Sequence, residues 1–198
     1  MKKYSGFTLI ELMITLFIAG ILLTVGLPSL DSFMQRNRLV ATTNELISAF
    51  HVARSEAIKL NARVSICASS DGVKCSGSTS WNTGWIVFVD RNGDLLGTGA
   101  ACSAPGTDCL LRSDKRTANS QLTIAGVDNN STAVSAFTFT SRGLPRDISG
   151  ASRSGVFSIC SLDTGGSTIG SRAVVLGLSG RVRVSDNAAV IPAVISCP

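Results

Sequence analysis

The chain has 198 residues, of which 44% are hydrophobic, and its mean hydropathy is +0.32. Its 18 basic and 13 acidic residues give a formal net charge of +5. Roughly 135 residues lie beyond the helical N-terminal part described below, which is enough for one domain with its own core and excludes a series of domains.

The N-terminus combines a basic leader with an apolar segment. Lys2 and Lys3 precede a run over residues 7–27 in which Glu11 is the one charged residue. About 20 apolar residues are enough to span a bilayer as a helix, and the lysines favour a cytoplasmic start. An ordinary secretory signal is shorter and ends in a small-residue cleavage site, whereas here the small residue Gly6 precedes the run. We therefore expect a leader at residues 1–6 and a retained transmembrane helix at 7–27.

Glu11 is a candidate functional residue because a carboxylate inside a membrane helix costs about 2.5 to 3.5 kcal/mol on insertion scales. Such a group needs a partner. The alternative interpretation is that Glu11 lies at the headgroup level and snorkels to water.

Residues 28–60 are predicted to continue the helix outside the membrane. Pro28, after Gly20 and Gly26, predicts a kink or local melting, with Asp31 as a new N-cap. An apolar stripe follows at three- and four-residue steps, made of Leu39, Thr43, Leu46, Phe50, Ala53, Ala57 and Leu60. The polar flank, which includes Arg54, is interpreted as a solvated face, and His51 as a structural helix histidine.

Residues 61–198 carry short strand-like runs separated by turn residues. The predicted strands are 64–68, 85–89, 122–125, 136–140, 156–160, 173–178 and 181–185. Asn92-Gly93 and Ser179-Gly180 are typical tight-turn pairs, and 96–105 and 162–171 are predicted loops. The expected fold class is α+β, with one long N-terminal helix and a β-rich antiparallel head.

Six cysteines, all beyond the apolar segment, indicate disulfides in an oxidising compartment. Six cysteines allow 15 pairings, which the sequence alone does not separate. Short loops favour Cys67–Cys75 and Cys102–Cys109, which leaves Cys160–Cys197 to hold the end of the chain. A zinc site has weak support, because no Cys-x-x-Cys occurs and His51 is the one histidine.

The last third of the chain carries the excess positive charge. From residue 142 onward there are six arginines against three aspartates, whereas residues 7–141 hold ten residues of each sign. This asymmetry points to an anionic partner. Besides the pair described next, the arginines that could contribute are Arg142, Arg146, Arg153 and Arg172.

Gly180-Arg181-Val182-Arg183 is the main candidate site outside the anchor. On a strand, Arg181 and Arg183 point to one face about 6.5 to 7 Å apart, which is close to the spacing of successive phosphates, while Val182 points to the core. Two guanidinium groups could hold phosphates without reading bases. The alternative is that the arginines cover the wet face of a strand.

The sequence gives little support for catalysis, a cofactor or a metal. No nucleophile motif surrounds His51, and there is no phosphate-binding loop or paired-carboxylate motif. Residues 90–94 resemble part of a calcium loop but lack its glycine and later glutamate, so we predict a hairpin turn there. Trp81 and Trp85 are predicted to be packing residues.

The segment Gly6-Phe7-Thr8-Leu9-Ile10-Glu11 resembles the processing site of type IV prepilins and type II secretion pseudopilins. The resemblance implies cleavage by a prepilin peptidase between Gly6 and Phe7, and N-methylation of Phe7. It also implies that Glu11 meets the Phe7 amine of a neighbouring subunit during filament assembly.

Four later motifs extend the resemblance to nearly the whole chain: Ala53-Arg54-Ser55-Glu56-Ala57, Gly84-Trp85-Ile86-Val87-Phe88-Val89-Asp90, Phe137-Thr138-Phe139 and Gly180-Arg181-Val182-Arg183. In this order they resemble the GspH/FimT family of minor pilins and pseudopilins. The family implies a single-pass inner-membrane protein with a periplasmic head, later part of a filament with other major and minor pilins, and no small-molecule substrate.

The last motif resembles an element of FimT-type pilins that implies binding of extracellular double-stranded DNA in natural transformation. Two alternatives stay open, namely a purely structural minor pilin that primes assembly near the tip, and a type II secretion pseudopilin.

Overall fold

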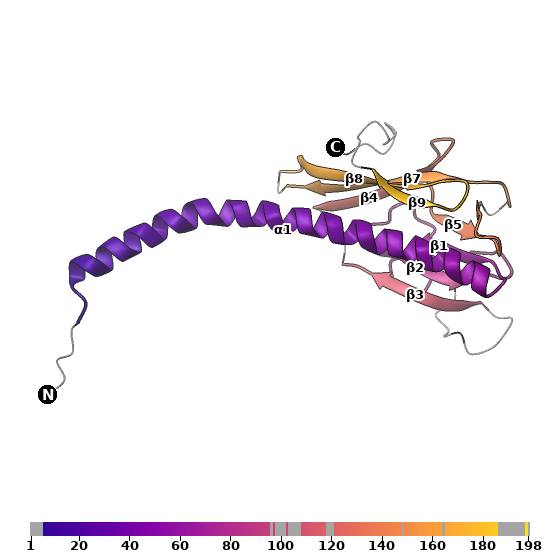
Figure 1. Ribbon diagram of the computed structural model, residues 1–198, viewed down its shortest axis with the longest axis horizontal. Coiled ribbons are helices and arrows are strands. Elements are labelled where there is room, and N and C mark those ends of the chain that lie inside the picture. Colours follow the sequence, from indigo (N-terminus) through magenta and orange to yellow (C-terminus); the bar gives the residue numbers. More distant parts are fainter. Residues whose placement is uncertain are drawn as a thin grey trace. The chain divides into compact units, whose positions relative to one another are not determined.

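The computed structural model describes residues 6–95, 97, 102, 108–117, 121–147, 149–163, 165–185 and 197. For residues 24–30 and 32 it describes the backbone alone. The chain divides into two compact units, Met1–Asn37 and Arg38–Pro198. Figure 1 shows helix α1, followed along the chain by strands β1 to β9. The α+β fold class predicted from the sequence is confirmed.

Helix α1, Leu9–Lys59, begins and ends within two residues of its predicted limits. Thr8 is its N-cap, because the Thr8 hydroxyl oxygen accepts the N–H of Glu11 at 3.3 Å. At the other end, the N–H of Ala62 reaches the carbonyl oxygen of Ala57 at 3.2 Å, and Asn61 has φ 47°. This left-handed residue after the last turn closes the helix.

Two predictions concern the middle of the helix. The helical backbone continues without a break through Pro28, so of the predicted kink or local melting the melting does not occur. Asp31 does not start a new helix. It lies inside α1, where its carboxylate accepts a hydrogen bond from Nε2 of Gln35 at 3.1 Å.

Among the described residues, no helix has both the length and the apolar character that crossing a membrane requires. The transmembrane helix at residues 7–27 stays a prediction.

The second half of α1 buries the predicted apolar stripe against the head. Leu46, Phe50, Ala53 and Ala57 are fully buried, and Leu39 is nearly so. Thr43 is also buried, and its hydroxyl donates to the carbonyl oxygen of Leu39 at 2.7 Å, so the polar group is satisfied within the helix. Leu60 is the exception, since it follows the last helical residue and is exposed.

The first sheet is antiparallel, with the strand order β3-β2-β1-β5-β6. Its strands are β1 (Val64–Ala68), β2 (Gly84–Val89), β3 (Cys109–Lys115), β5 (Ala136–Phe139) and β6 (Pro145–Arg146). Every residue of β1 and β2 is buried, as expected for central strands that are covered on both faces.

The second sheet is also antiparallel, with the order β4-β7-β8-β9. Its strands are β4 (Leu122–Asp128), β7 (Gly155–Leu162), β8 (Thr168–Leu176) and β9 (Val182–Ser185). In Figure 1 this sheet and the first one lie along the second half of α1. Strand β9 is an edge strand that pairs with β8 alone among the described residues.

The strand predictions fail at three places. Strand β3 was missed because it is an edge strand that ends in charged residues, with a short Arg112–Asp114 ion pair of 2.6 Å in place of an apolar face. Strand β6 was missed because it has two residues and contains Pro145. Strand β8 begins at Thr168, inside the predicted loop 162–171, because its small polar residues pair with β7 through the backbone. The predicted loop 96–105 lies outside the described residues, apart from Gly97 and Cys102.

One aromatic cluster joins the helix to both sheets. The ring centroid of Phe50 on α1 lies 6.1 Å from that of Phe137 on β5 and 5.2 Å from that of Phe157 on β7. Trp81 packs edge-on against Phe157 at 5.0 Å, and its indole N–H donates to the carbonyl oxygen of Val134 at 2.9 Å. Trp81 and Trp85 are both fully buried, which confirms the prediction that they are packing residues.

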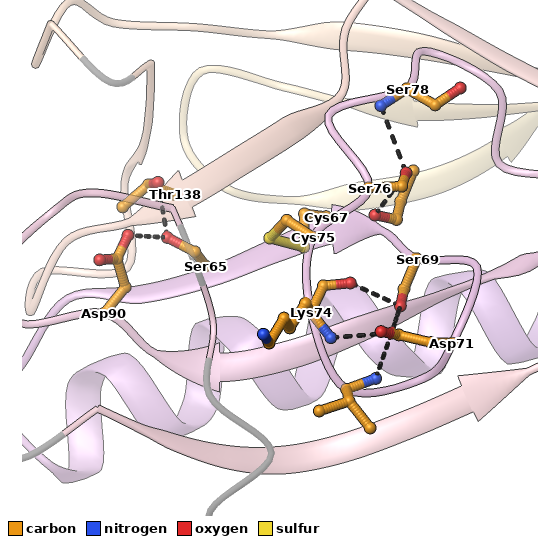
Figure 2. The surroundings of a disulfide bond; sticks show 12 residues. Ser65, Cys67, Ser69, Asp71, Lys74, Cys75, Ser76, Ser78, Asp90 and Thr138 are labelled. Carbon is orange, nitrogen blue, oxygen red and sulfur yellow. Dashed lines mark hydrogen bonds between the residues drawn. A yellow bond between two sulfur atoms is a disulfide. The ribbon is translucent and has the colours of Figure 1, made fainter.

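All three predicted disulfides are present: Cys67–Cys75, Cys102–Cys109 and Cys160–Cys197. Figure 2 shows the first, which ties the end of β1 to the loop that follows it. In that loop the carboxylate of Asp71 accepts the backbone N–H of Val73 and of Lys74, at 2.8 and 2.9 Å. These hydrogen bonds lower the pKa of Asp71 below its usual range.

We predict that Phe50→Ala lowers the free energy of unfolding by about 3 to 5 kcal/mol, because removing the ring leaves a cavity where helix α1 packs on both sheets. Denaturant unfolding of the full chain, followed by circular dichroism, measures this change. Asn44→Ala, an exposed change on the same helix, is the control and should alter the value by less than about 0.5 kcal/mol. Equal effects of the two changes would contradict the assigned core.

Candidate nucleic-acid interface

The β8–β9 hairpin presents the two candidate arginines. Its turn is closed by the N–H of Gly177, which donates to the carbonyl oxygen of Arg181 at 2.9 Å, and by the N–H of Gly180, which donates to that of Gly177 at 2.8 Å. Val182 is half-buried and packs on the main core, whereas Arg181 and Arg183 are exposed. The alternation of the strand therefore directs the two guanidinium groups away from the core.

Arg181 and Arg183 line one open pocket of about 610 Å³. Helix α1 contributes His51 and Arg54 to the same pocket, and the rest of the described lining is Val175, Gly177, Ser179 and Val182. None of these lining residues is acidic. The pocket is therefore a concentration of positive charge formed by two elements that lie far apart in the sequence.

Two glycines allow Arg54 to reach this pocket. Gly143 (φ 72°) and Gly180 (φ 74°) both have a left-handed backbone, which favours glycine. A Cβ on Gly143 would lie 3.0 Å from Nε of Arg54, and one on Gly180 would lie 3.1 Å from the same atom. A Cβ on Gly180 would also collide with the carbonyl oxygen of Gly143. The glycine before Arg181 thus permits close packing of two turns on the Arg54 side chain.

The other candidate arginines are not gathered into the pocket. Arg142 is exposed and precedes Gly143, in the turn that touches Gly180. Arg146 donates to the carbonyl oxygen of Gly150 and, at 2.7 Å, to the hydroxyl of Ser152, so it holds its own loop. Arg172 is half-buried on β8 and does not line the pocket.

Arg153 is neutralised by an ion pair. Its Nη2 lies 3.0 Å from the buried carboxylate of Asp128, and its guanidinium lies 5.7 Å from the ring centroid of Phe137. Burial opposes ionisation of Asp128, but the N–H of Thr132 and the Arg153 guanidinium outweigh it and lower the pKa. Arg153 therefore has a structural role within the head.

The chain bends at residues 91–92 but does not form the hairpin turn predicted at 90–94, because β2 ends at Val89 and its partner β3 begins only at Cys109. The buried carboxylate of Asp90 accepts the N–H of Gly93 at 2.9 Å and the hydroxyl of Ser65 at 2.7 Å. Because the single proton of Ser65 is used there, Thr138 donates to the Ser65 oxygen at 2.7 Å (Figure 2). Burial raises the pKa of Asp90, helped by the charges of Asp108 and Asp94.

Asp90, Asp94 and Asp108 bring carboxylate oxygens within 4.8 Å of one another, and they are the one such group found among the described residues. Both oxygens of Asp90 already accept hydrogen bonds from the protein. We assign no metal to this group.

The N-terminal site precedes and opens helix α1. Gly6 and Phe7 are exposed and non-helical, so the Gly6–Phe7 bond is accessible. Thr8 and Glu11 have the spacing of a capping box, in which the glutamate returns a hydrogen bond to the cap residue. Here the Glu11 carboxylate has no hydrogen bond or ion pair with a described residue, and it is exposed.

Sequence reasoning missed His51 and Arg54 as members of the pocket. Their i, i+3 spacing places two basic side chains on one face of the helix. This spacing is the feature of the sequence that could have indicated a shared site. Arg54 was interpreted as part of a solvated flank. The structure corrects this, since Arg54 is half-buried and its Nε is fully enclosed.

Comparison with known proteins identifies two regions. A protein-family model described as "Type II transport protein GspH" matches residues 42–180, more than half of the chain. This match includes Arg54, Gly143 and Gly180 and ends before Arg181. A second model, described as "Prokaryotic N-terminal methylation motif", matches residues 1–27.

Two solved structures are similar to the chain. The chain resembles the type IV minor pilin FimU of Pseudomonas aeruginosa, with 24% identity, a TM-score of 0.49, and coverage of 77% of this chain and 92% of that one. It also resembles the minor pseudopilin EpsH from the type 2 secretion system of Vibrio cholerae, with 9% identity, a TM-score of 0.47, and coverage of 75% and 96%.

We predict that Gly180→Ala destabilises the head by about 1 to 3 kcal/mol, because the new methyl group meets the Gly143 carbonyl oxygen in a left-handed turn. Thermal unfolding followed by circular dichroism measures the loss. Gly177→Ala is the matched control in the same hairpin, since its Cβ would have no atom nearer than 3.7 Å. If Gly177→Ala were the more damaging change, the packing around Gly180 would be misassigned.

Proposed function

This chain belongs to the GspH family of type II transport proteins, and from that premise we propose that it is a minor pilin of a type IV pilus that binds extracellular DNA. The family comprises structural subunits of pilin and pseudopilin type, so the chain is a filament subunit rather than an enzyme. The finer proposal is sequence-independent binding of double-stranded DNA in natural transformation.

Assembly proceeds through the N-terminal helix in this proposal. The peptidase that processes prepilins cuts between Gly6 and Phe7, and the new amine of Phe7 is methylated. The helix holds the subunit in the inner membrane with its head in the periplasm, and the subunit then joins a filament of other pilins. Support comes from the methylation-motif match over residues 1–27.

The surface of this helix also supports assembly. Twelve large apolar side chains between Phe7 and Leu23 are each at least half exposed, from 84% for Phe7 to 50% for Ile18 and Ile21. So large an apolar surface needs lipid or other subunits to cover it. Glu11, unpartnered among the described residues, is then neutralised by the Phe7 amine of a neighbouring subunit.

DNA binding rests on one observation, the open pocket in which Arg181, Arg183 and Arg54 converge without an acidic residue in its described lining. No described residue forms an ion pair or hydrogen bond with the Arg181 or Arg183 guanidinium. Free guanidinium groups bind phosphate oxygens, and their affinity falls as salt rises because counterions are released from DNA. No aromatic side chain lines the described pocket, so base stacking does not contribute.

A pseudopilin of a type II secretion system is the second candidate. The family description itself favours it. A deletion mutant that fails to export folded proteins, yet keeps surface pili and DNA uptake, would support this function. Loss of pili without any DNA binding by the chain would instead indicate a purely structural subunit near the tip.

We predict that Glu11→Gln reduces incorporation into filaments about tenfold or more, because the neighbouring ammonium loses its counter-charge. Immunoblots of sheared filaments measure incorporation, and mass spectrometry should still find a chain that begins at Phe7. Asp31→Asn, which removes an acid elsewhere on the same helix, is the control and should assemble normally. Normal assembly of Glu11→Gln would contradict the pairing.

We predict that Arg181→Ala combined with Arg183→Ala weakens binding of the full chain, in detergent, to duplex DNA. Affinity should fall about tenfold or more at low salt, and the slope of log affinity against log salt should become shallower by about 2. Fluorescence anisotropy with a labelled duplex, at several salt concentrations, measures both quantities.

The control removes the same charge away from the pocket. Lys74 and Arg91 are exposed and do not line it, so Lys74→Ala with Arg91→Ala should leave affinity and salt slope close to those of the parent. Equal losses in the two double variants would show a general effect of net charge and refute a site at the arginine pair.

A further inference from the structure

We infer that Arg54 is a third phosphate contact of the DNA site, held between the Gly143 and Gly180 turns so that helix α1 and the β8–β9 hairpin bind the same strand together. This inference rests on the proposed DNA-binding function. It adds a residue from the helix to a site that the sequence motif confines to the hairpin.

The position of Arg54 is fixed by close contacts along its side chain. A Cβ on Gly143 would meet Cγ and Nε of Arg54 at 3.2 and 3.0 Å, and a Cβ on Gly180 would meet Cδ and Nε at 3.4 and 3.1 Å. Both glycine turns therefore lie directly against the stem of this arginine. A side chain with so little space has few rotamers to lose on binding, so its guanidinium is preorganised.

The hydrogen bonding of Arg54 is incomplete. Its Nε is buried and has no partner among the described residues. Arg54 also forms none of the ion pairs found between described residues, although Arg112, Arg116 and Arg153 in the same unit each have a carboxylate partner. A buried donor without an acceptor is costly, and an unpaired arginine with three neighbouring cationic or basic groups is repelled by them. An anion in the pocket would relieve this repulsion.

The pocket has a geometry that one duplex strand can use. Arg181 and Arg183 are separated along the hairpin by about 6.5 to 7 Å, the step of two strand residues. Arg54 lines the same pocket from the helix, together with His51. A DNA strand lying along Arg181 and Arg183 would then also meet the guanidinium of Arg54. Its phosphates would be contacted both by the β8–β9 hairpin and by helix α1.

The alternative is that Arg54 acts as packing alone. In that case its aliphatic stem supports the two turns, and replacing its charge would change stability without changing how binding depends on salt. The two roles are therefore separated by the salt slope, which counts phosphate contacts and is insensitive to modest changes in stability.

The test compares the full chain in detergent with three variants, by fluorescence anisotropy on a labelled duplex. Arg54→Gln removes the charge, and Arg54→Lys keeps it. Arg38→Gln is the control, because Arg38 is exposed on the same helix and does not line the pocket. If Arg54→Gln fails to fold, Arg54→Met, which keeps an apolar stem against the glycines, takes its place.

For Arg54→Gln we expect affinity to fall about five- to tenfold at low salt and the slope to become shallower by about 0.9, the value for one phosphate contact. Arg54→Lys and Arg38→Gln should keep the parent slope. If Arg54→Gln and Arg54→Met keep the parent slope while the Arg181 and Arg183 double variant loses binding, Arg54 is not a phosphate contact, and the proposed DNA-binding function stands. If the parent chain does not bind duplex DNA, the proposed function and the Arg54 contact are both refuted.

Discussion

The packing of one helix face on two sheets is the interaction on which the rest of the head depends. Each antiparallel sheet has a buried face that needs a cover, and the Phe50 side of α1 supplies one for both, through Phe137 on β5 and Phe157 on β7. Because this face is fixed by the core, the position of every other residue around the helix axis is fixed as well within the part of α1 that belongs to the head unit, from Arg38 to Lys59. His51 and Arg54, one and four positions after Phe50, are thereby directed toward the β8–β9 hairpin.

The candidate site is thus a consequence of the core. Its cations come from a helix and a hairpin that the sequence places far apart, and two glycine turns let the hairpin approach the helix closely. Gly180 links the sequence motif to the packing of the head, because it belongs to the Gly-Arg-Val-Arg sequence and also touches Arg54 and Gly143. We therefore interpret the glycine of that motif as a packing requirement, while the arginines supply the chemistry.

Local patterns in the sequence predicted the local structure well. The apolar stripe located the buried face of α1, short loops indicated the disulfide pairing, and β-branched runs located β1 and β2. Strand β3 escaped because an edge strand does not need the apolar alternation that reveals a central one. Arg54 escaped for a different reason. Its environment is set by Gly143 and Gly180, and no periodicity of the helix encodes contact with two distant turns.

The two proposed functional regions lie in different units of the chain and use different physics. In the proposed function Glu11, in the unit Met1–Asn37, is a single charge among apolar side chains that acts through a strong interaction with one partner amine. In the same proposal Arg54, Arg181 and Arg183, in the unit Arg38–Pro198, act together through weak, salt-dependent contacts with phosphates. Because the units share no part of either site among the described residues, assembly and DNA binding should be genetically separable. A change that removed both together would have to act through the fold of the head or the continuity of α1.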